Sequence, residues 1–437
     1  MSFHDWLLLF LAASILTLFE RVRKILLIGI PLTVGILAIF QQNYSIKVLG
    51  SFGVSLSFDG NSKIFLIGAF IGFSIVALHI LKERVSFAFS FLFLTSFLTL
   101  GFLFISNDLF NIYVLMEVLS VEAGLLILEN VDEKKLWASL KYLMIGNVGA
   151  SLYLIGTLLY YTKNGTFEII PNPHISKIIF SLMWSGILVR TGVFGFGMWL
   201  PQFHSNASDK LSALLSGVFV SGGIYVLARL QSLFPIQNWK TVAPFLALAA
   251  SIFTLASKNP KRALAWSTMS HVTLMTGALT AAPLYSLSHT IAKTILFLHS
   301  GSMKKKTYNM GEFMLLLMAT LSLIGMPFTI GNFSEKFLMK DLIQPLKWVA
   351  AFSVWISGGA ILKYLKKPCI KKGLTHSIFL IPAFFYPNFS WLGLVGFLVA
   401  FIFSLLPVRK DTYTRLEKLE ENTLLVGLGL VVITWLF

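Results

Sequence analysis

Long apolar stretches alternate with short polar loops along the whole chain. Stretches of about 17–25 apolar residues can cross a bilayer as helices, and the pattern predicts about fourteen of them. The expected spans are 4–19, 25–40, 62–81, 86–106, 109–128, 136–161, 178–198, 207–231, 241–257, 263–281, 284–301, 311–343, 346–365 and 374–407, the last holding one pass or two, before a final apolar run at 422–437. The chain is therefore expected to form one all-α polytopic membrane domain over residues 1–437.

The composition excludes a soluble protein. Hydrophobic residues make up 56% of the 437 residues and charged residues only 12%, whereas soluble domains carry about 25% charged residues. The single cysteine, Cys369, excludes an internal disulfide framework and the thiolate clusters that hold iron–sulfur centres or zinc. The first apolar run ends in Glu20 and Arg21 without a small-residue cleavage site, so no removable signal peptide is expected.

The net charge of +16 reflects topology and not nucleic-acid binding, because the basic residues gather in alternate loops. Cationic groups follow the first, third, fifth, seventh, ninth, eleventh and thirteenth runs, and the intervening loops carry only scattered lysines. The positive-inside rule then places these loops in the cytoplasm and the N-terminus outside. We expect a multi-pass protein of the cell's inner (plasma) membrane. The charged segment 409–422 is expected to form a short surface helix.

A few ionisable side chains lie inside the expected spans, where a charge costs roughly 2.5–3.5 kcal/mol and marks a functional pathway or an ion pair. They are Glu117, Lys141, Arg190, His289, Lys293 and the adjacent Glu335 and Lys336. Lys141 lies one turn inside its helix, which leaves open either a buried role or snorkelling to the interface. His289 and Lys293 are four residues apart and so share a helix face.

Four residues leave alternatives open. Only one of Glu335 and Lys336 need face the interior, because adjacent residues point to different faces of a helix. Glu122 is compatible with packing or with an interface. His271 is compatible with a core histidine whose ring nitrogens are both hydrogen-bonded.

Two of the spans are expected to be interrupted. The seventh runs into TGVFGFGMWLP (191–201) at its end, and the twelfth contains IGMPFTIGNF (324–333). Proline removes a backbone donor and glycine lowers helix propensity. Interrupted helices at corresponding positions in two halves of a membrane protein are typical of an ion or substrate site built from inverted repeats.

These residues bring out a family resemblance. The chain resembles the antiporter-like subunits shared by respiratory complex I, Mrp cation/proton antiporters and membrane-bound hydrogenases. The resemblance rests on NDLFNIYVLMEVLS (107–120), LKYLMIGNVGASLYLIGTLLYY (140–161), WLPQFHSNASDKLSALLSGVFVSGGIYVLARL (199–230), KRALAWSTMSHVTLMTGAL (261–279), LSHTIAKTILFLHSGSM (287–303) and IGMPFTIGNFSEKFLM (324–339). These segments follow the family's order between about residues 105 and 340.

The resemblance implies a fold of fourteen transmembrane helices with two inverted five-helix repeats, in which helices 7 and 12 are broken. The implied parts are N-terminal helices (1–105), a first half-channel (106–231), a second half-channel (241–365) and C-terminal helices (366–437). It also implies an ion pathway along the middle of the membrane. Its members would be Glu117, Lys141, Arg190, Ser221, His289, Lys293 and Lys336.

Two residues depart from the family pattern. Arg190 stands where the family usually has a lysine on the seventh helix, and an arginine does not deprotonate in proteins. Ser221 stands where many members have a lysine on the eighth helix, so water would have to bridge a proton path there. The first half would then act as an electrostatic gate, while Lys293 and Lys336 move protons.

The sequence therefore predicts an ion-translocating subunit, for H+ and as a second candidate Na+, of a redox-driven or Mrp-type complex. Its partners would be other membrane subunits and peripheral redox subunits, with membrane lipid around it and no nucleic acid. No cofactor and no metal are expected, because motifs for haem, iron–sulfur or nucleotide binding are absent. The subunit itself would be non-catalytic. The alternatives are a structural subunit with a decayed relay and a self-sufficient secondary transporter.

Overall fold

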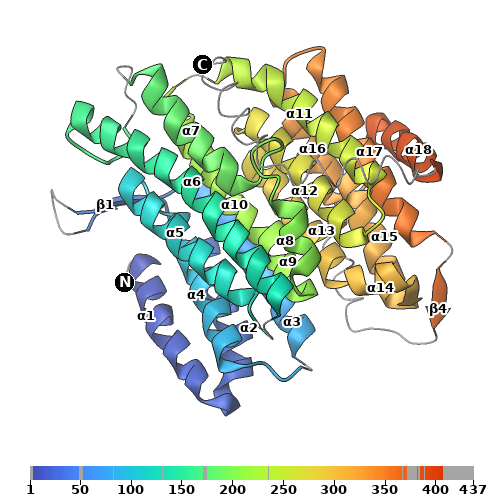
Figure 1. The fold of residues 1–437 in the computed structure, drawn as a ribbon, viewed down its shortest axis with the longest axis horizontal. Coiled ribbons are helices and arrows are strands. Elements are labelled where there is room, and N and C mark those ends of the chain that lie inside the picture. The colour runs from blue at the N-terminus through green and yellow to red at the C-terminus, as the bar shows by residue number, and fades with distance from the viewer. Residues whose placement is uncertain are drawn as a thin grey trace.

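The described part of the chain is a bundle of helices (Figure 1). A computed structural model describes residues 3–48, 53–81, 83–129, 132–170, 175–234, 236–366, 368–371, 381, 384–387 and 389–406. Its first helices are α1 (Phe3–Ser14) with the 3-10 turn η1 (Ile15–Leu18), α2 (Glu20–Phe40), α3 (Gly60–Ile80), α4 (Phe87–Leu103), α5 (Leu109–Leu126), α6 (Glu133–Asn164) and α7 (Lys177–Thr191). The expected run 422–437 and segment 409–422 lie outside the described residues.

The remaining helices continue the bundle to Leu405. They are α8 (Leu200–Asn206), α9 (Asp209–Leu214), the π-helix η3 (Leu215–Phe219), α10 (Val220–Leu230), α11 (Gln237–Ala256), α12 (Pro260–Gly277), α13 (Ala282–Leu298), α14 (Ser300–Lys305), α15 (Met310–Ile324), α16 (Ile330–Asp341), α17 (Leu346–Leu365) and α18 (Trp391–Leu405). Two short ribbons complete it: β1 (Tyr44–Lys47) pairs antiparallel with β2 (Ser55–Phe58), and β3 (Thr307–Asn309) pairs parallel with β4 (Cys369–Lys371).

Seven helical stretches in the described residues are long and apolar enough to cross a membrane. They are Glu20–Phe40, Gly60–Ile80, Leu109–Leu126, Glu133–Asn164, Asp209–Leu230, Asn238–Ala256 and Leu346–Leu365, and four shorter apolar helices accompany them. Helices α12 and α13 are absent from both groups because buried serine, threonine, histidine and lysine side chains lower their hydropathy. A polytopic helical fold is thus present, and the count of fourteen stays a prediction.

Both expected interruptions are present. Helix α7 ends at Thr191 and α8 begins at Leu200, and between them Gly192 and Gly195 adopt positive φ angles of 77° and 88°. Helix α15 ends at Ile324, where Gly325 has a φ of 78°. The glycines and prolines of these two segments therefore correctly predicted where the helical backbone is interrupted.

A third irregularity lies in the expected span 207–231, where nothing in the sequence indicated it. Residues Leu215–Phe219 form one π-helical turn between α9 and α10. A π-turn shifts its carbonyls off the usual ladder. The carbonyl of Gly217 accepts a hydrogen bond from Thr290 Oγ1 at 2.6 Å, and Ser216 Oγ lies 2.5 Å from Thr268 Oγ1. The irregular turn is thus tied to α13 and α12.

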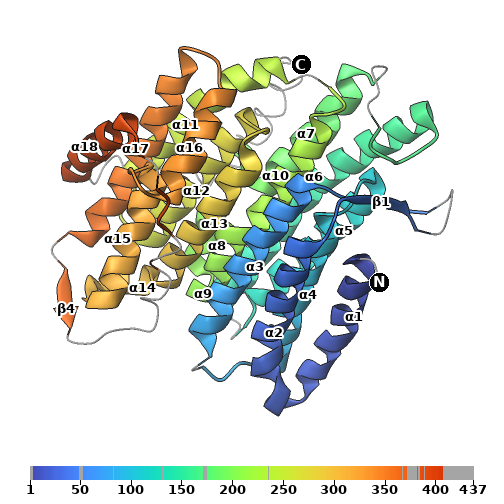
Figure 2. The ribbon, with the colours of Figure 1, turned by 180° about the vertical axis from the view of Figure 1, so that it is seen from behind.

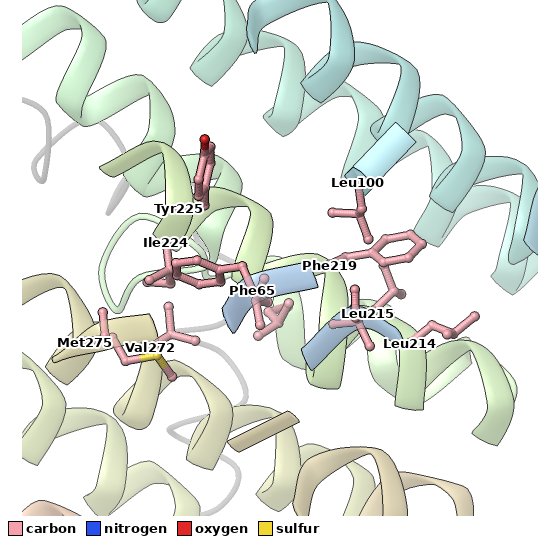
Figure 3. Close-up of a cluster of buried hydrophobic side chains, with 14 of the residues drawn as sticks. Phe65, Leu100, Leu214, Leu215, Phe219, Ile224, Tyr225, Val272 and Met275 are labelled. Atoms are coloured by element: carbon pink, nitrogen blue, oxygen red, sulfur yellow. The ribbon is translucent and has the colours of Figure 1, made fainter. Parts of the chain in front are cut away.

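Helices α1–α5 occupy one end of the bundle and α14–α18 the other, with α8–α10, α12 and α13 between them (Figures 1 and 2). Buried apolar side chains join these groups. Phe65 of α3, Leu100 of α4 and Phe219 of η3 lie in one cluster with Ile224 of α10 and Val272 of α12 (Figure 3). The centre of the bundle is therefore closely packed, and polar side chains reach it only at specific positions.

Candidate ion pathway

An ion pair between α5 and α7 lies at the first interruption. The guanidinium of Arg190 pairs with the carboxylate of Glu117 and donates to the carbonyl of Met116 at 3.3 Å. The Arg190 side chain is 4% exposed, whereas that of Glu117 is 27% exposed. Gly146 of α6 lies beside the guanidinium, since a Cβ there would be in van der Waals contact with Arg190 Cζ at 3.6 Å. Both residues are candidates from the sequence analysis, and the structure brings them together.

A small cavity continues from the ion pair toward the π-helix. Its volume is about 30 Å3, and its lining includes Ser120, Tyr142, Arg190, Trp199 and Phe219. A cavity needs roughly 10–15 Å3 to hold a water molecule. One water molecule beside Arg190 would therefore fit here, with polar groups of α5, α6 and α7 around it.

The two neighbouring candidates of the first half differ in their surroundings. Lys141 of α6 is half-buried, and its ammonium lies 3.4 Å from the side-chain oxygen of Gln202 in α8. Ser221 of α10 is 3% exposed and donates to the carbonyl of Val218 at 2.5 Å. Lys141 thus connects α6 with the interrupted segment, and the Ser221 hydroxyl is engaged within its own helix.

A second group of polar side chains surrounds α13. Lys293 is fully buried, and its ammonium donates to the carbonyl of Leu264 in α12 at 3.1 Å. The His289 ring, also buried, lies 5.7 Å from the ring of His271 in α12. His289 and Lys293 therefore face the same neighbour, as their spacing predicted.

His271 connects this group to three other side chains. Its Nδ1 lies 2.7 Å from the hydroxyl of Tyr285, and its Nε2 lies 3.3 Å from the hydroxyl of Ser357 in α17. The Ser357 hydroxyl in turn lies 2.7 Å from that of Ser267. Both ring nitrogens of His271 have partners, which is the core-histidine alternative of the sequence analysis, yet the ring also extends the polar group toward α17.

The side chain of Glu335 packs against the second interruption, and this resolves the choice between the two adjacent residues of α16. Glu335 is 5% exposed, and a Cβ at Gly325 would lie 1.6 Å from its Oε2. The carboxyl group therefore occupies the space that the glycine leaves open. Lys336 is half-buried and points elsewhere, donating to the carbonyl of Phe389 at 2.9 Å. Glu335 is thus the member of the pair that faces the interior.

Sequence analysis missed His204, which lies between the two groups. It is fully buried in α8, its ring stacks on Phe297 of α13 at 4.6 Å, and neither ring nitrogen has a hydrogen-bond partner among the described residues. In the sequence His204 lies between the expected spans 178–198 and 207–231, outside both. Only the helix α8 after the interruption brings this ring next to α13.

A further buried pair lies at the end of α13. His299 Nδ1 is 2.9 Å from Glu312 Oε1 of α15, and the ring of His79 in α3 lies 5.4 Å from that of His299. Glu122 is also buried, with Thr99 of α4 donating to it at 3.3 Å. Its position between α4 and α5 is compatible with the packing role left open above.

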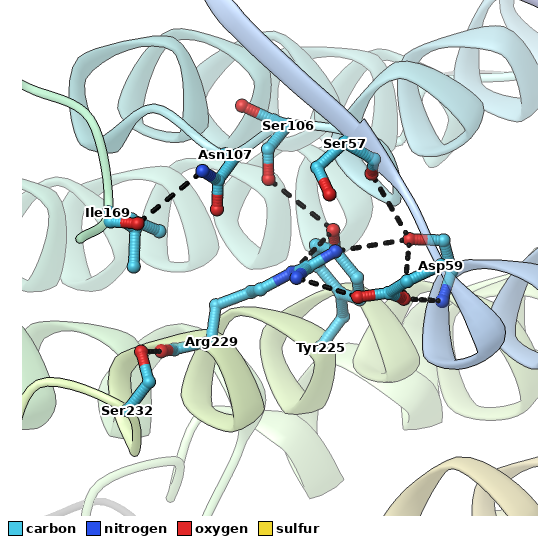
Figure 4. Close-up of polar contacts among 9 residues, drawn as sticks. Ser57, Asp59, Ser106, Asn107, Ile169, Tyr225, Arg229 and Ser232 are labelled. Carbon is cyan, nitrogen blue, oxygen red and sulfur yellow. Dashed lines mark hydrogen bonds and ion pairs between the residues drawn. The ribbon is translucent and has the colours of Figure 1, made fainter. Parts of the chain in front are cut away.

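Ion pairs lie at the two ends of the continuous stretch from α9 to α10 and join it to neighbouring helices. At one end Arg229 of α10 lies 2.8 Å from Asp59 and donates to the hydroxyls of Tyr225 and Ser62 (Figure 4). At the other end Lys261 lies 2.6 Å from Asp209. These contacts join α3 to α10 and α9 to α12, so they position the helices that carry the central polar groups.

Comparison with known proteins identifies the family. A family model described as "NADH:quinone oxidoreductase/Mrp antiporter, TM" matches residues 106–360, which is more than half of the chain. The chain belongs to this family of antiporter-like membrane subunits. The match includes both interruptions and every candidate pathway residue.

Curated relatives align over part of their length. NADH-quinone oxidoreductase subunit N of Desulforudis audaxviator is 28% identical over 286 residues, covering 56% of this chain and 56% of the relative. Hydrogenase-4 component B of Escherichia coli is 26% identical over 235 residues, covering 46% of this chain and 35% of the relative. The chain thus aligns with about half or less of the length of these two proteins.

Solved structures share the fold over nearly the whole chain. A chain of the Mrp complex from Dietzia sp. superposes with a TM-score of 0.75 at 16% identity, covering 99% of this chain and 98% of that one. A chain of an archaeal membrane-bound sulfane sulfur reductase gives 0.74 at 18% identity, covering 98% and 96%. A chain of respiratory complex I from Thermus thermophilus gives 0.73 at 18% identity, covering 92% and 96%. The family fold therefore extends beyond the segments with recognisable sequence similarity.

Proposed function

We propose that this chain is the ion-translocating membrane subunit of a multisubunit complex, with H+ as the cargo and Na+ as the second candidate. One observation carries the proposal. Ionisable side chains follow one another across the bundle from the partly accessible Glu117 and its partner Arg190 to the buried His204, Lys293, His289 and Glu335. Buried ionisable groups in a membrane protein are costly and mark ion pathways.

In the proposed mechanism the first half acts on the second electrostatically. Arg190 does not release a proton, so it controls Glu117 by pairing with it or separating from it. Separation would leave the positive charge of Arg190 unpaired near the small cavity. That charge would disfavour the protonated forms of His289 and Lys293. Lys293, His289 and Glu335 can each bind and release a proton, and we assign the moving protons to them. Lys336 and Lys141 would serve the two ends of the path, and water would bridge the neutral Ser221.

We propose further membrane subunits as partners. Exposed apolar residues cover the outer side of α5 and α6, including Val121 and Met144, and Glu117 lies at the edge of this face with more than a quarter of its side chain accessible. A carboxylate at membrane depth is costly against lipid. A neighbouring membrane subunit on this face would cover it, and peripheral redox subunits or an opposing ion gradient would supply the energy.

The arrangement of the chain in the membrane belongs to the same proposal. We assign residues 1–105 to N-terminal helices, 106–231 and 241–365 to two inverted half-channels, and 366–437 to C-terminal helices. The membrane is the plasma membrane and the N-terminus lies outside. Supporting this orientation, three exposed lysines lie on the same predicted side: Lys134 in the first turn of α6, Lys258 in the loop after α11 and Lys304 in α14.

Gentle purification of the tagged chain with its partners, followed by mass spectrometry and transport assays in liposomes, tests the proposal. We expect membrane subunits to co-purify and the reconstituted complex to move H+ or Na+. A chain that purifies alone and transports an organic solute would support the secondary-transporter alternative. A complex whose transport is unaffected by changes at Lys293 and Glu335 would support a purely structural subunit.

A further inference from the structure

A basic pocket lies away from the candidate pathway, at the end of the bundle where the lysines gather. Its volume is about 350 Å3. The described residues that line it include four lysines and no acidic side chain: Lys258, Lys304, Lys306 and Lys363, with Ser257, Pro260, Met303, Tyr364 and Leu406. The proposed ion movement uses none of them.

Hydrogen bonds fix the frame of this pocket. The Tyr364 hydroxyl donates to the carbonyl of Ser257 at 2.8 Å, and the Tyr308 hydroxyl donates to the carbonyl of Tyr364 at 3.0 Å. Burial raises the pKa of Tyr308 to about 12, so its hydroxyl stays a donor over the physiological range. Lys363 donates to the carbonyl of Leu255 at 3.0 Å. The ends of α11 and α17 and the strand β3 are therefore held together around the cavity.

The positive charges of the lysines in this pocket favour an anionic ligand. Lys304 and Lys306 are exposed and have no ion-pair partner among the described residues. Lys306 has a φ of 52°, a left-handed conformation that is uncommon for residues other than glycine. It ends α14, and its carbonyl accepts from the backbone of Cys369 at 3.0 Å. Two free ammonium groups are thus presented from a turn that is fixed on both sides.

An apolar stripe leads out of the pocket along α18. Leu398, Ile402 and Leu405 are each about 60% exposed, lie at helical spacing and run toward Leu406, which lines the pocket. A free phosphate would use the lysines alone. A phospholipid would also place an acyl chain on the stripe while its phosphate lies among the lysines.

We propose that this pocket binds the headgroup of an anionic phospholipid whose acyl chain lies along α18. Basic pockets between helix ends on the cytoplasmic side are suited to anionic headgroups, and each lysine near such a surface contributes about 1 kcal/mol. The position of the pocket at the ends of α11, α17 and α18 places it at the level of the headgroups. This inference does not depend on the identity of the translocated ion.

The test compares lipid binding by the full chain, with any co-purifying subunits, in native mass spectrometry and thermal-shift assays. The probes are phosphatidylglycerol, phosphatidylcholine and inorganic phosphate. The variant K304Q/K306Q removes both free lysines, and K304R/K306R keeps their charge. The matched control R84Q/K134Q removes two exposed cations from the same predicted side of the protein, far from the pocket in sequence.

We expect phosphatidylglycerol, and not phosphatidylcholine, to bind and to raise the melting temperature of the wild type, the control and K304R/K306R. In K304Q/K306Q the binding should weaken about 30-fold, the factor that corresponds to about 1 kcal/mol per lysine at 1.4 kcal/mol per tenfold. Equal binding in the two glutamine variants would overturn the proposal. A phosphate effect as large as that of phosphatidylglycerol would also overturn it, because the ligand would then be a free anion.

Discussion

Arg190 gives the first half of the proposed pathway a positive charge that does not titrate, in contrast to the second half. Its guanidinium stays charged at any pH at which a protein functions, is almost fully buried, and pairs with a carboxylate that is partly accessible. A lysine in the same place could release its proton, which Arg190 cannot. The first half therefore carries a permanent charge whose only adjustable property is its distance from Glu117.

Two substitutions of Arg190 test whether its positive charge or the shape of its guanidinium group matters for transport. We expect R190Q to lower ion translocation by the assembled complex roughly tenfold or more, because the remaining buried carboxylate loses its partner. R190K keeps a cation and should retain most of the translocation. Proton uptake into liposomes, followed with a pH-sensitive dye, measures both. Equal activity of R190Q and wild type would show that the pair has no role in transport.

Lys293 offers a test that separates transport from stability. An unbranched methionine fills similar space without a charge that must be desolvated, so K293M should keep or raise the melting temperature. Translocation should fall roughly 100-fold, since a positioned proton carrier contributes at least that much. The exposed K134M is the control for lysine removal and should leave both quantities unchanged. Loss of stability with normal translocation would contradict the proposed role.

At the scale of elements, composition predicted the two interruptions, because glycine and proline act on the backbone directly. The π-helix at Leu215–Phe219 has no such signature: its stability comes from contacts with Thr290 and Thr268, which are distant in sequence. The choice between Glu335 and Lys336 depended on where α16 begins after the interruption. His204 needed the short helix α8, which the hydropathy pattern could not separate from a loop.

Two neighbouring glycines of the first interruption should respond very differently to alanine. Gly195 has a φ of 88° and nothing within 4 Å of a built Cβ, so G195A should cost only roughly 1–2 kcal/mol of backbone strain. At Gly197 a Cβ would lie 2.2 Å from the Cα of Gly192. We expect G195A to melt slightly below wild type and G197A to lose the folded protein, as measured by thermal shift and size-exclusion chromatography. Similar behaviour of the two variants would contradict this backbone geometry.

At the scale of the whole molecule, the exposed apolar face of α5 and α6 is the feature that points to a neighbouring subunit. Sequence similarity indicated the family, but which helix faces stay uncovered depends on how the entire bundle packs. Val121 and Met144 are 48% and 65% exposed on this face. We propose that a neighbouring subunit covers them.

A bulky substitution on this face should separate the chain from its neighbour. V121W should abolish or strongly reduce co-purification of membrane partners while leaving the chain folded, because tryptophan is tolerated against lipid but fills the space that a partner needs. I36W on α2, where Ile36 is similarly exposed at 45%, is the control and should keep the partners. Quantitative mass spectrometry of the purified material measures both. If V121W co-purifies with as much of its membrane partners as the wild type does, the interface lies elsewhere.

The π-turn between α9 and α10 has a consequence for evolution by insertion and deletion. One residue turns an α-helix by about 100°, and a π-turn accommodates one extra residue without unwinding the helix. Deleting a single residue within Leu215–Phe219 would therefore return this turn to regular α-helix with little rotation of α10 relative to α9, whereas a deletion elsewhere in α9 or α10 would rotate the residues on either side by about 100°. The deletion within the turn would instead remove the irregular turn whose Gly217 carbonyl accepts from Thr290, so we expect the length of this turn to be preserved even where its side chains change.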